Sequence, residues 1–200
     1  CLNWGCIPTK SLLKSAQVFD YTKNAANYGV KIDGDIKPDF EAMVGRSREV
    51  ANGMSKGIEF LFKKNKIDVL NGFGKIVDKG KVEVAGDKGK KEVYEAKNIM
   101  LATGARSKEL PNLKQDGKKI IGYRKAMTLE KQPESMVVVG SGAIGAEFAY
   151  FYATLGTKVT LVEFLPNVLP NEDEEVSKQM ARSFKKAGMK VMTNSSVEKV

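Results

Sequence analysis

Histidine is absent from this chain of 200 residues, which also holds only two cysteines and one tryptophan. Without histidine, these residues alone cannot build a Ser-His-Asp triad, a Cys-His dyad or a His-ligated zinc site. We therefore expect any imidazole chemistry to come from another chain or from sequence outside this one. Long hydrophobic runs are missing too, since no stretch approaches the roughly eighteen apolar residues that a membrane-spanning helix needs.

Positive charge exceeds negative charge in the composition. The chain has 33 Lys and Arg against 24 Asp and Glu, which gives a formal net charge of +9. The excess is nearly all lysine spread in ones and twos, whereas nucleic-acid-binding proteins more often cluster arginine and aromatic residues on one face. We interpret it as a solvated lysine surface rather than a nucleic-acid site. With 42% hydrophobic residues, the chain can bury a core in one large or two small domains.

The first part of the chain combines two helical patterns with short β runs. Apolar spacing predicts helices over residues 9–28 and 38–64. Five β runs follow, at residues 67–70, 73–77, 81–84, 92–96 and 98–102. Glycine-containing turns separate them, one of these at residues 86–89. These runs predict a small antiparallel meander that feeds a buried strand.

The second part of the chain alternates strands with helices. Strands are predicted at residues 136–139, 159–163 and 189–192, with helices at 143–155 and 172–187 between them. Such alternation builds a parallel sheet covered by helices. The fold class is therefore α/β, and we place one domain at residues 1–125 and another at 126–200.

A G-x-G-x-x-G pattern follows the first strand of the second domain and opens its first helix. It consists of Gly140, Ser141, Gly142, Ala143, Ile144 and Gly145. In this context the pattern predicts dinucleotide binding: Gly140 permits the tight turn, Gly142 lets a pyrophosphate approach, and Gly145 lets helix and strand pack closely. The helix N–H groups then bind the phosphates. The alternative is a glycine-rich turn that binds no ligand.

Glu163 stands at the end of the next strand, eighteen residues beyond the glycine pattern. In this position a carboxylate accepts hydrogen bonds from the adenosine ribose hydroxyls. It would repel a 2′-phosphate by up to about 4 kcal/mol at 4 Å and an effective dielectric of 20. No arginine lies between Glu163 and Arg182 to reverse this repulsion. We therefore predict NAD, rather than NADP, as the coenzyme.

The two cysteines, Cys1 and Cys6, stand at the start of the first predicted helix. Their spacing differs from a C-x-x-C zinc knuckle, and no further Cys or His completes a tetrahedral site, so we predict no metal. A helix N-terminus favours a thiolate, which makes a redox pair the better interpretation. Taken alone, two structural thiols remain the alternative.

Several segments together resemble one enzyme family over the whole chain. They are Cys-Leu-Asn-Trp-Gly-Cys-Ile-Pro-Thr-Lys at 1–10, Asn-Gly-Phe-Gly-Lys-Ile at 71–76, Ala-Thr-Gly at 102–104, Gly-Ser-Gly-Ala-Ile-Gly-Ala-Glu-Phe-Ala at 140–149 and Val-Thr-Leu-Val-Glu at 159–163. In kind and order these resemble the flavin-dependent pyridine nucleotide-disulfide reductases, most of all those that oxidise dihydrolipoamide. The resemblance implies two Rossmann-like domains, for FAD and then NAD, both incomplete in this central piece.

The resemblance also implies roles for four residues at the redox centre. Cys1 would be the interchange thiol that exchanges with the lipoyl group, and Cys6 would lie next to the flavin and form its charge-transfer contact. Lys10 would sit beside the flavin and pair with Glu147 from the nucleotide helix. Without the resemblance, Lys10 and Glu147 are two ordinary surface residues.

Other cofactor contacts implied by the resemblance lie along the rest of the chain. Gly74 would approach the FAD adenine through its backbone, and Thr103, Gly104 and Ala105 would line the far side of FAD. Val197 would pack on the NAD adenine, although a plain core valine is the alternative. Trp4 departs from the smaller apolar residue expected between the cysteines, which leaves the chemistry intact but changes the local packing.

The function implied is oxidation of protein-bound dihydrolipoamide through a redox disulfide, FAD and NAD. Its partners would be the lipoyl domains of 2-oxo acid dehydrogenase acyltransferases or the glycine cleavage carrier protein. A second subunit of a homodimer would supply the missing histidine, held by a glutamate. We expect no nucleic acid, no membrane, and a place in the bacterial cytoplasm, or in the mitochondrial matrix of a eukaryote. The alternatives are a glutathione-type or mercuric-type reductase, or a catalytically silent NAD-binding protein of the same fold.

Overall fold

The computed structural model describes residues 1–86 and 89–200, which divide into two compact units. The first unit joins Cys1–Ser55 to Ser107–Val200, and the second is Lys56–Arg106. The first unit thus brings the N-terminal helices together with the C-terminal β-α-β region. The domain boundary expected at residues 125 and 126 stays a prediction. No helix in the described part of the chain is both long and apolar enough to cross a membrane.

Helix α1, Cys6–Lys23, begins three residues earlier than expected and continues as a short 3-10 turn at Ala25–Tyr28. Pro8 lies in its first turn, where a missing N–H leaves no hydrogen bond unmade. The turn ends at Gly29, whose φ of 72° is the left-handed stop predicted from sequence. The predicted helix over residues 9–28 is therefore confirmed for residues 9–23, and its last turn is a 3-10 helix instead.

Helix α2, Phe40–Lys64, matches the second predicted helix. The Asp39 carboxylate accepts a hydrogen bond of 2.9 Å from the Ala42 N–H, which satisfies one free donor of the first turn. The boundary between the two units falls within this helix, and its fully buried residues, Ser47 and Ala51, lie in the first unit. The earlier turns of α2 therefore contribute to the core of the first unit.

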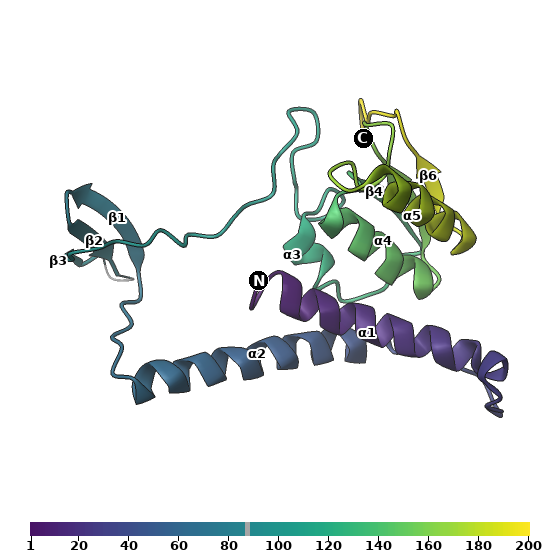
Figure 1. The fold of residues 1–200 in the computed structure, drawn as a ribbon, viewed down its shortest axis with the longest axis horizontal. Coiled ribbons are helices and arrows are strands. Elements are labelled where there is room, and N and C mark those ends of the chain that lie inside the picture. The colour runs from purple at the N-terminus through teal and green to yellow at the C-terminus, as the bar shows by residue number, and fades with distance from the viewer. Residues whose placement is uncertain (87–88) are drawn as a thin grey trace. The chain divides into compact units, whose positions relative to one another are not determined.

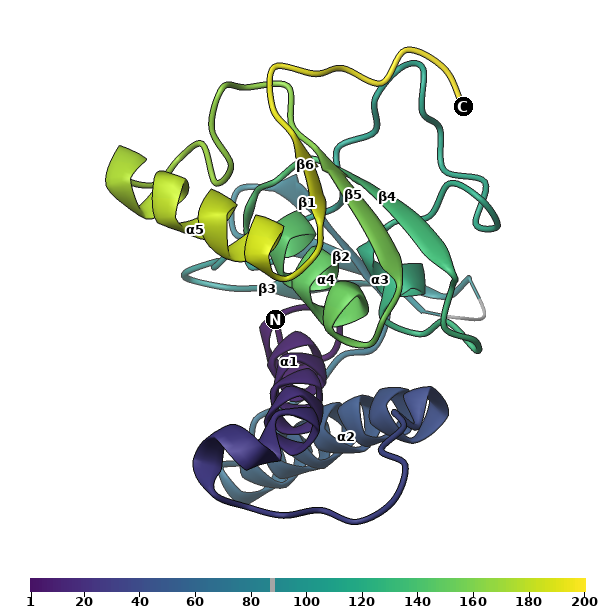
Figure 2. The ribbon, with the colours of Figure 1, turned by 90° about the vertical axis from the view of Figure 1, so that its right-hand side faces the viewer.

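The first unit contains a three-stranded parallel sheet in the order β4-β5-β6 (Figures 1 and 2). Its elements are β4 Ser135–Val139, α4 Ala143–Thr154, β5 Lys158–Val162, α5 Glu174–Lys186 and β6 Lys190–Met192, with the short α3 Tyr123–Ala126 before them. Glycines at the ends of both crossover helices have positive φ, 100° at Gly156 and 82° at Gly188. The predicted strand-helix alternation is confirmed throughout.

Helix α4 contributes the largest fully buried side chains to the core of the first unit. Phe148, Phe151 and Tyr152 on α4 are at most 5% exposed and belong to one cluster with Leu12 and Ala16 of α1. The α1 helix lies between α4 and the first turns of α2 in both views of the ribbon (Figures 1 and 2). The helix that starts at the second cysteine is therefore packed on the helix that starts at the glycine pattern.

The second unit is an antiparallel meander of β1 Phe73–Asp78, β2 Lys81–Ala85 and β3 Lys91–Glu95. Three of the five predicted β runs are thus confirmed, with a tight turn at Gly80, where φ is 70°. The turn expected at residues 86–89 includes 87 and 88, which lie outside the described residues.

Two predicted strands, at residues 67–70 and 98–102, are wrong for this structure. Both stretches are irregular, and their apolar side chains are open to solvent, with Met100 90% and Leu101 72% exposed. A strand needs a neighbour that accepts and donates its backbone hydrogen bonds. Among the described residues neither stretch has such a neighbour, so an apolar run alone does not make it a strand.

Candidate redox and nucleotide site

A disulfide joins Cys1 to Cys6, with their Cα atoms 4.6 Å apart. The expectation that the two cysteines lie close enough to bridge is confirmed. The loop between them folds tightly, because a Cβ on Gly5 would stand only 3.0 Å from the Cα of Cys1. Glycine therefore lets the loop close this tightly without a shift of the Cys1 backbone. The Cys1 carbonyl also accepts a 3.1 Å hydrogen bond from the Ile7 N–H, which ties the loop to the first turn of α1.

Cys6 is the first residue of α1, so its sulfur lies at the positive end of the helix dipole. Thr9 reinforces this turn, because its hydroxyl and its N–H both donate to the Gly5 carbonyl, at 2.7 and 3.1 Å. A helix N-terminus stabilises a thiolate relative to a thiol. When the disulfide is reduced, this position therefore favours negative charge on Cys6.

Lys10 on α1 and Glu147 on α4 form an ion pair in which the lysine Nζ donates to the carboxylate. The pairing that the family resemblance implied is present. The lysine side chain is 66% exposed and the glutamate 28%, so the pair by itself adds little to stability. Its proximity to a flavin stays a prediction.

The glycine pattern forms a tight turn between β4 and α4. Gly140 has φ of 94°, and its N–H donates 2.8 Å to the Val162 carbonyl, which fixes the turn to β5. A Cβ on Gly145 would overlap the Gly140 carbonyl oxygen, so only glycine permits this packing. A Cβ on Gly142 would instead meet nothing within 4 Å. The loop thus leaves open space where a phosphate would approach.

The remaining three residues of the pattern differ in exposure. Ser141 is fully buried, whereas Ala143 and Ile144 begin α4 at the surface, with Ile144 59% exposed. The first turn of a helix has N–H groups that no helical carbonyl accepts, and these are the groups that bind anions. The exposed start of α4 therefore suits a phosphate.

Glu163 lies directly after β5 and is hydrogen-bonded to the glycine pattern. Its Oε2 accepts from the Ser141 N–H and hydroxyl, both at 2.7 Å, and its Oε1 accepts from the Leu165 N–H at 2.9 Å. Glu163 is only 7% exposed. Burial raises the pKa of this carboxyl, but the donors from Leu165 and Ser141 outweigh burial and leave the pKa below its usual value. Glu163 is therefore held as a carboxylate beside the loop.

The other predicted contact residues belong to both units. Gly74 is in β1 of the second unit, paired with Val84, and Thr103–Ala105 follow that unit's sheet as an exposed, irregular segment in which Gly104 has φ of 76°. Val197 follows β6 in the first unit, where its carbonyl accepts 2.7 Å from the Asn112 side chain. Their contacts with cofactors stay predictions.

Two arginines around Trp4 were missed at the sequence level. The guanidinium of Arg48 lies 4.5 Å from the Trp4 ring centroid and that of Arg124 5.7 Å. Arg48 also donates 2.6 Å to the Asn3 carbonyl. The unusual tryptophan between the cysteines was the only signal, and it does not tell which distant cations contact it.

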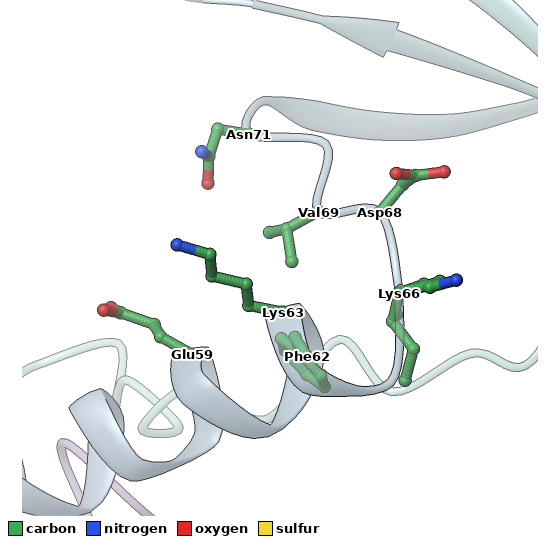
Figure 3. Close-up of a pocket in the computed structure, with 8 residues that line it drawn as sticks. Glu59, Phe62, Lys63, Lys66, Asp68, Val69 and Asn71 are labelled. Atoms are coloured by element: carbon green, nitrogen blue, oxygen red, sulfur yellow. The ribbon is translucent and has the colours of Figure 1, made fainter.

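An open hollow of about 600 Å³ in the second unit contains none of the predicted site residues (Figure 3). Its lining is Glu59, Phe62, Lys63, Lys66, Ile67, Asp68, Val69 and Asn71. Glu59 and Lys63 extend from the end of α2 toward the side of Asn71, just before β1. Its charged side chains, Glu59, Lys63, Lys66 and Asp68, are all exposed, and Lys66 has a left-handed φ of 55° just after the end of α2. We therefore describe the hollow as a surface depression without an assigned chemical role.

The family model described as pyridine nucleotide-disulphide oxidoreductase matches residues 1–200. The chain is 46% identical over 200 residues to a dihydrolipoyl dehydrogenase from Zymomonas mobilis, covering 99% of this chain and 42% of that protein. It is 48% identical over 191 residues to one from Chlorobaculum parvum, covering 96% and 40%. The crystal structure of LpdA from Mycobacterium tuberculosis superimposes with a TM-score of 0.89 at 27% identity, covering 100% and 44%. The chain thus spans about two fifths of the length of these relatives.

Proposed function

The chain belongs to the pyridine nucleotide-disulphide oxidoreductase family, and on that premise we propose that it is part of an enzyme that oxidises dihydrolipoamide and reduces NAD. The observation that carries the proposal is the Cys1–Cys6 disulfide at the start of α1, packed against the helix of the glycine pattern. The relatives named dihydrolipoyl dehydrogenase support this substrate over glutathione or mercuric ion.

The disulfide exchanges with the dithiol of dihydrolipoamide. One substrate thiolate attacks the sulfur of Cys1, which forms a mixed disulfide and releases Cys6 as a thiolate. The second substrate thiolate then attacks the mixed disulfide, which closes lipoamide and frees the sulfur of Cys1. The cysteine pair has then gained two electrons, and the protein has taken up the two protons that the substrate thiols lost. The dipole of α1 stabilises the Cys6 thiolate in this state.

Lys10 lies one helical turn after Cys6 and therefore on the same face of α1. A flavin placed against that face would touch both side chains, so the arrangement of the disulfide, Lys10 and Glu147 fits FAD. When bound, FAD supplies a two-electron carrier between the dithiol and NAD. Lys10 holds a positive charge at that face, and Glu147 fixes the position of the lysine Nζ.

The glycine pattern fits the pyrophosphate of NAD. The open space at Gly142 and the exposed start of α4 accept the phosphates, and Glu163 offers a fixed carboxylate for the ribose hydroxyls. Over the whole cycle, dihydrolipoamide and NAD⁺ become lipoamide, NADH and one proton. Because these residues include no histidine, the proton acceptor for the substrate thiols comes from outside the chain.

From the family resemblance, we propose a homodimer in which a histidine of the second subunit completes each active site. The electron donors are the lipoyl domains of 2-oxo acid dehydrogenase complexes or the glycine cleavage carrier. We assign the enzyme to the bacterial cytoplasm, or to the mitochondrial matrix if its source is a eukaryote, because reducing compartments keep disulfides for transient, catalytic use.

An NAD⁺-reduction assay of the full-length protein with dihydrolipoamide tests the proposal. We expect absorbance of NADH to rise with dihydrolipoamide, and no comparable oxidation of NADPH with glutathione disulfide. The variant Cys1→Ser is the matched control, because it removes the exchange sulfur alone. Turnover with glutathione disulfide but not with lipoamide would instead identify the glutathione-type alternative.

A further inference from the structure

The loop between the two cysteines is held at its middle by side chains of α2. Arg48 donates 2.6 Å to the Asn3 carbonyl and stacks on Trp4, 4.5 Å from the ring centroid. Ser55 donates 3.0 Å to the Asn3 side-chain oxygen. We call these contacts of Arg48 and Ser55 with Asn3 and Trp4 the loop clamp.

The residues of the loop clamp are themselves held by the core of the first unit. The second guanidinium nitrogen of Arg48 lies 3.5 Å from the sulfur of Met127, which is fully buried. The Ser55 hydroxyl also lies 3.1 Å from the Ala51 carbonyl of its own helix, so its single hydrogen is shared between the two acceptors. Arg124 covers Trp4 as well, at 5.7 Å. The clamp thus connects the redox loop to the core of the first unit.

The clamp matters most when the disulfide is open. In the oxidised protein the S–S bond closes the loop covalently. In the dithiol no bond joins Cys1 to Cys6, and Cys1 is free to move with the residues before the helix. Contacts at Asn3 and Trp4 then determine how often the two sulfurs meet. A loop that these contacts already hold in place loses less conformational entropy when the disulfide closes than a free loop does.

We propose that Arg48 is a positioning residue that keeps the Cys1 and Cys6 thiols adjacent in the reduced enzyme and thereby favours closure of the disulfide. The proposal rests on the proposed function only for its place in the catalytic cycle. Closure forms the S–S bond, releases two protons and passes two electrons to an acceptor, which in the test is a cyclic organic disulfide. Arg48 itself exchanges no electron or proton.

The thiol-disulfide equilibrium of the full-length flavoprotein tests this role directly. The protein is equilibrated with mixtures of dithiothreitol and its cyclic disulfide, and the closed fraction is counted by mass after alkylation of free thiols. We expect Arg48→Ala to lower the equilibrium constant for closure about tenfold, as loss of a charged hydrogen bond and a cation-π contact implies. For a two-electron couple this raises the reduction potential by about 30 mV.

Arg46→Ala is the matched control, because Arg46 lies on the same helix but bonds to Ser11 and Ser15 of α1 instead of the loop. We expect it to leave the closure equilibrium unchanged. An equal shift in Arg46→Ala and Arg48→Ala, or no shift in either, would overturn the proposal. This measurement needs no lipoamide, so a negative result would count against the role of Arg48 and not against the proposed substrate.

Two further variants separate the clamp from charge and from misfolding. Arg48→Lys keeps the charge but loses the planar guanidinium that stacks on Trp4, so we expect it to behave like Arg48→Ala. Full recovery by lysine would contradict the clamp. Trp4→Val removes the ring under Arg48, and Arg48→Ala should have a smaller effect in that background than in the wild type. If Arg48→Ala does not fold, Arg48→Lys and Trp4→Val decide the question by the same measurement.

Discussion

Lys10 and Glu147 are 137 residues apart in the sequence and form an ion pair that bridges α1 and α4. One of these helices begins at a redox cysteine and the other at the glycine pattern. The ion pair therefore links the redox disulfide to the nucleotide loop within one packed unit. It adds to the apolar core in which Leu12 and Ala16 of α1 pack with α4.

Neutralising Glu147 should impair turnover without unfolding the protein. In Glu147→Gln the Lys10 Nζ loses the charge that orients it, so we expect kcat to fall by about tenfold or more. The melting temperature should change little, because exposed ion pairs contribute at most about 1 kcal/mol. Glu174→Gln removes the exposed pair with Lys178 and serves as a control that keeps full activity. Equal kcat values for the two variants would show that the Lys10 pair is only a surface contact.

Two glycines of the nucleotide loop should respond in opposite ways to alanine. Gly145→Ala places a Cβ against the Gly140 carbonyl and should destabilise the fold by about 1–3 kcal/mol, as overpacking does. Gly142→Ala meets open space at a φ of −61°, so its stability should stay within about 0.5 kcal/mol. Its KM for NAD should rise, because the methyl group occupies the space of a phosphate. Thermal unfolding and steady-state kinetics check both, and a reversed pattern would contradict the assigned roles.

Glu163 should determine the choice of coenzyme. We expect the full-length enzyme to prefer NAD over NADP by about a hundredfold or more in kcat/KM, since the carboxylate repels a 2′-phosphate. Glu163→Gln removes that charge and should narrow the ratio. Glu172→Gln, an exposed glutamate in the following loop, should leave it unchanged. Nearly equal values for the two coenzymes in the wild type would refute this role.

The Glu163 carboxylate should also make the free energy of unfolding depend on pH. Its pKa is lower in the folded protein, so its hydrogen bonds to Ser141 and Leu165 are fully present above the ordinary glutamate pKa of about 4.3. They are lost as pH falls through the lower folded pKa. The difference in unfolding free energy between wild type and Glu163→Gln should be constant above about pH 5 and shrink below about pH 4. Denaturant titrations across that range measure it.

The β-α-β region could be predicted because its signals are local. Apolar periodicity, the glycine pattern and the stop glycines Gly156 and Gly188 each act within a few residues of the element they define. The same local rule failed at residues 67–70 and 98–102, because a strand also needs a partner strand. Met100 and Leu101 are exposed because no strand among residues 1–86 and 89–200 pairs with their segment.

In the site, too, features that depend on local sequence could be predicted, and those that depend on packing between distant elements could not. Closeness of Cys1 and Cys6 follows from their spacing at a helix start, and the structure has them bonded. The clamp on Trp4 depends on how α2 packs beside the loop, which no local pattern around Arg48 encodes. Only the three-dimensional packing of α1, α2 and α3 brings these side chains together.

The visible spectrum of the full-length flavoprotein with single Cys→Ser substitutions tests the proposed function most directly. If Cys6 is the sulfur beside the flavin and Cys1 exchanges with lipoamide, both variants lose lipoamide turnover. Cys1→Ser then keeps or strengthens a long-wavelength thiolate-to-flavin absorption, and Cys6→Ser lacks it. The opposite assignment of the band, or undiminished turnover in either variant, would contradict the account.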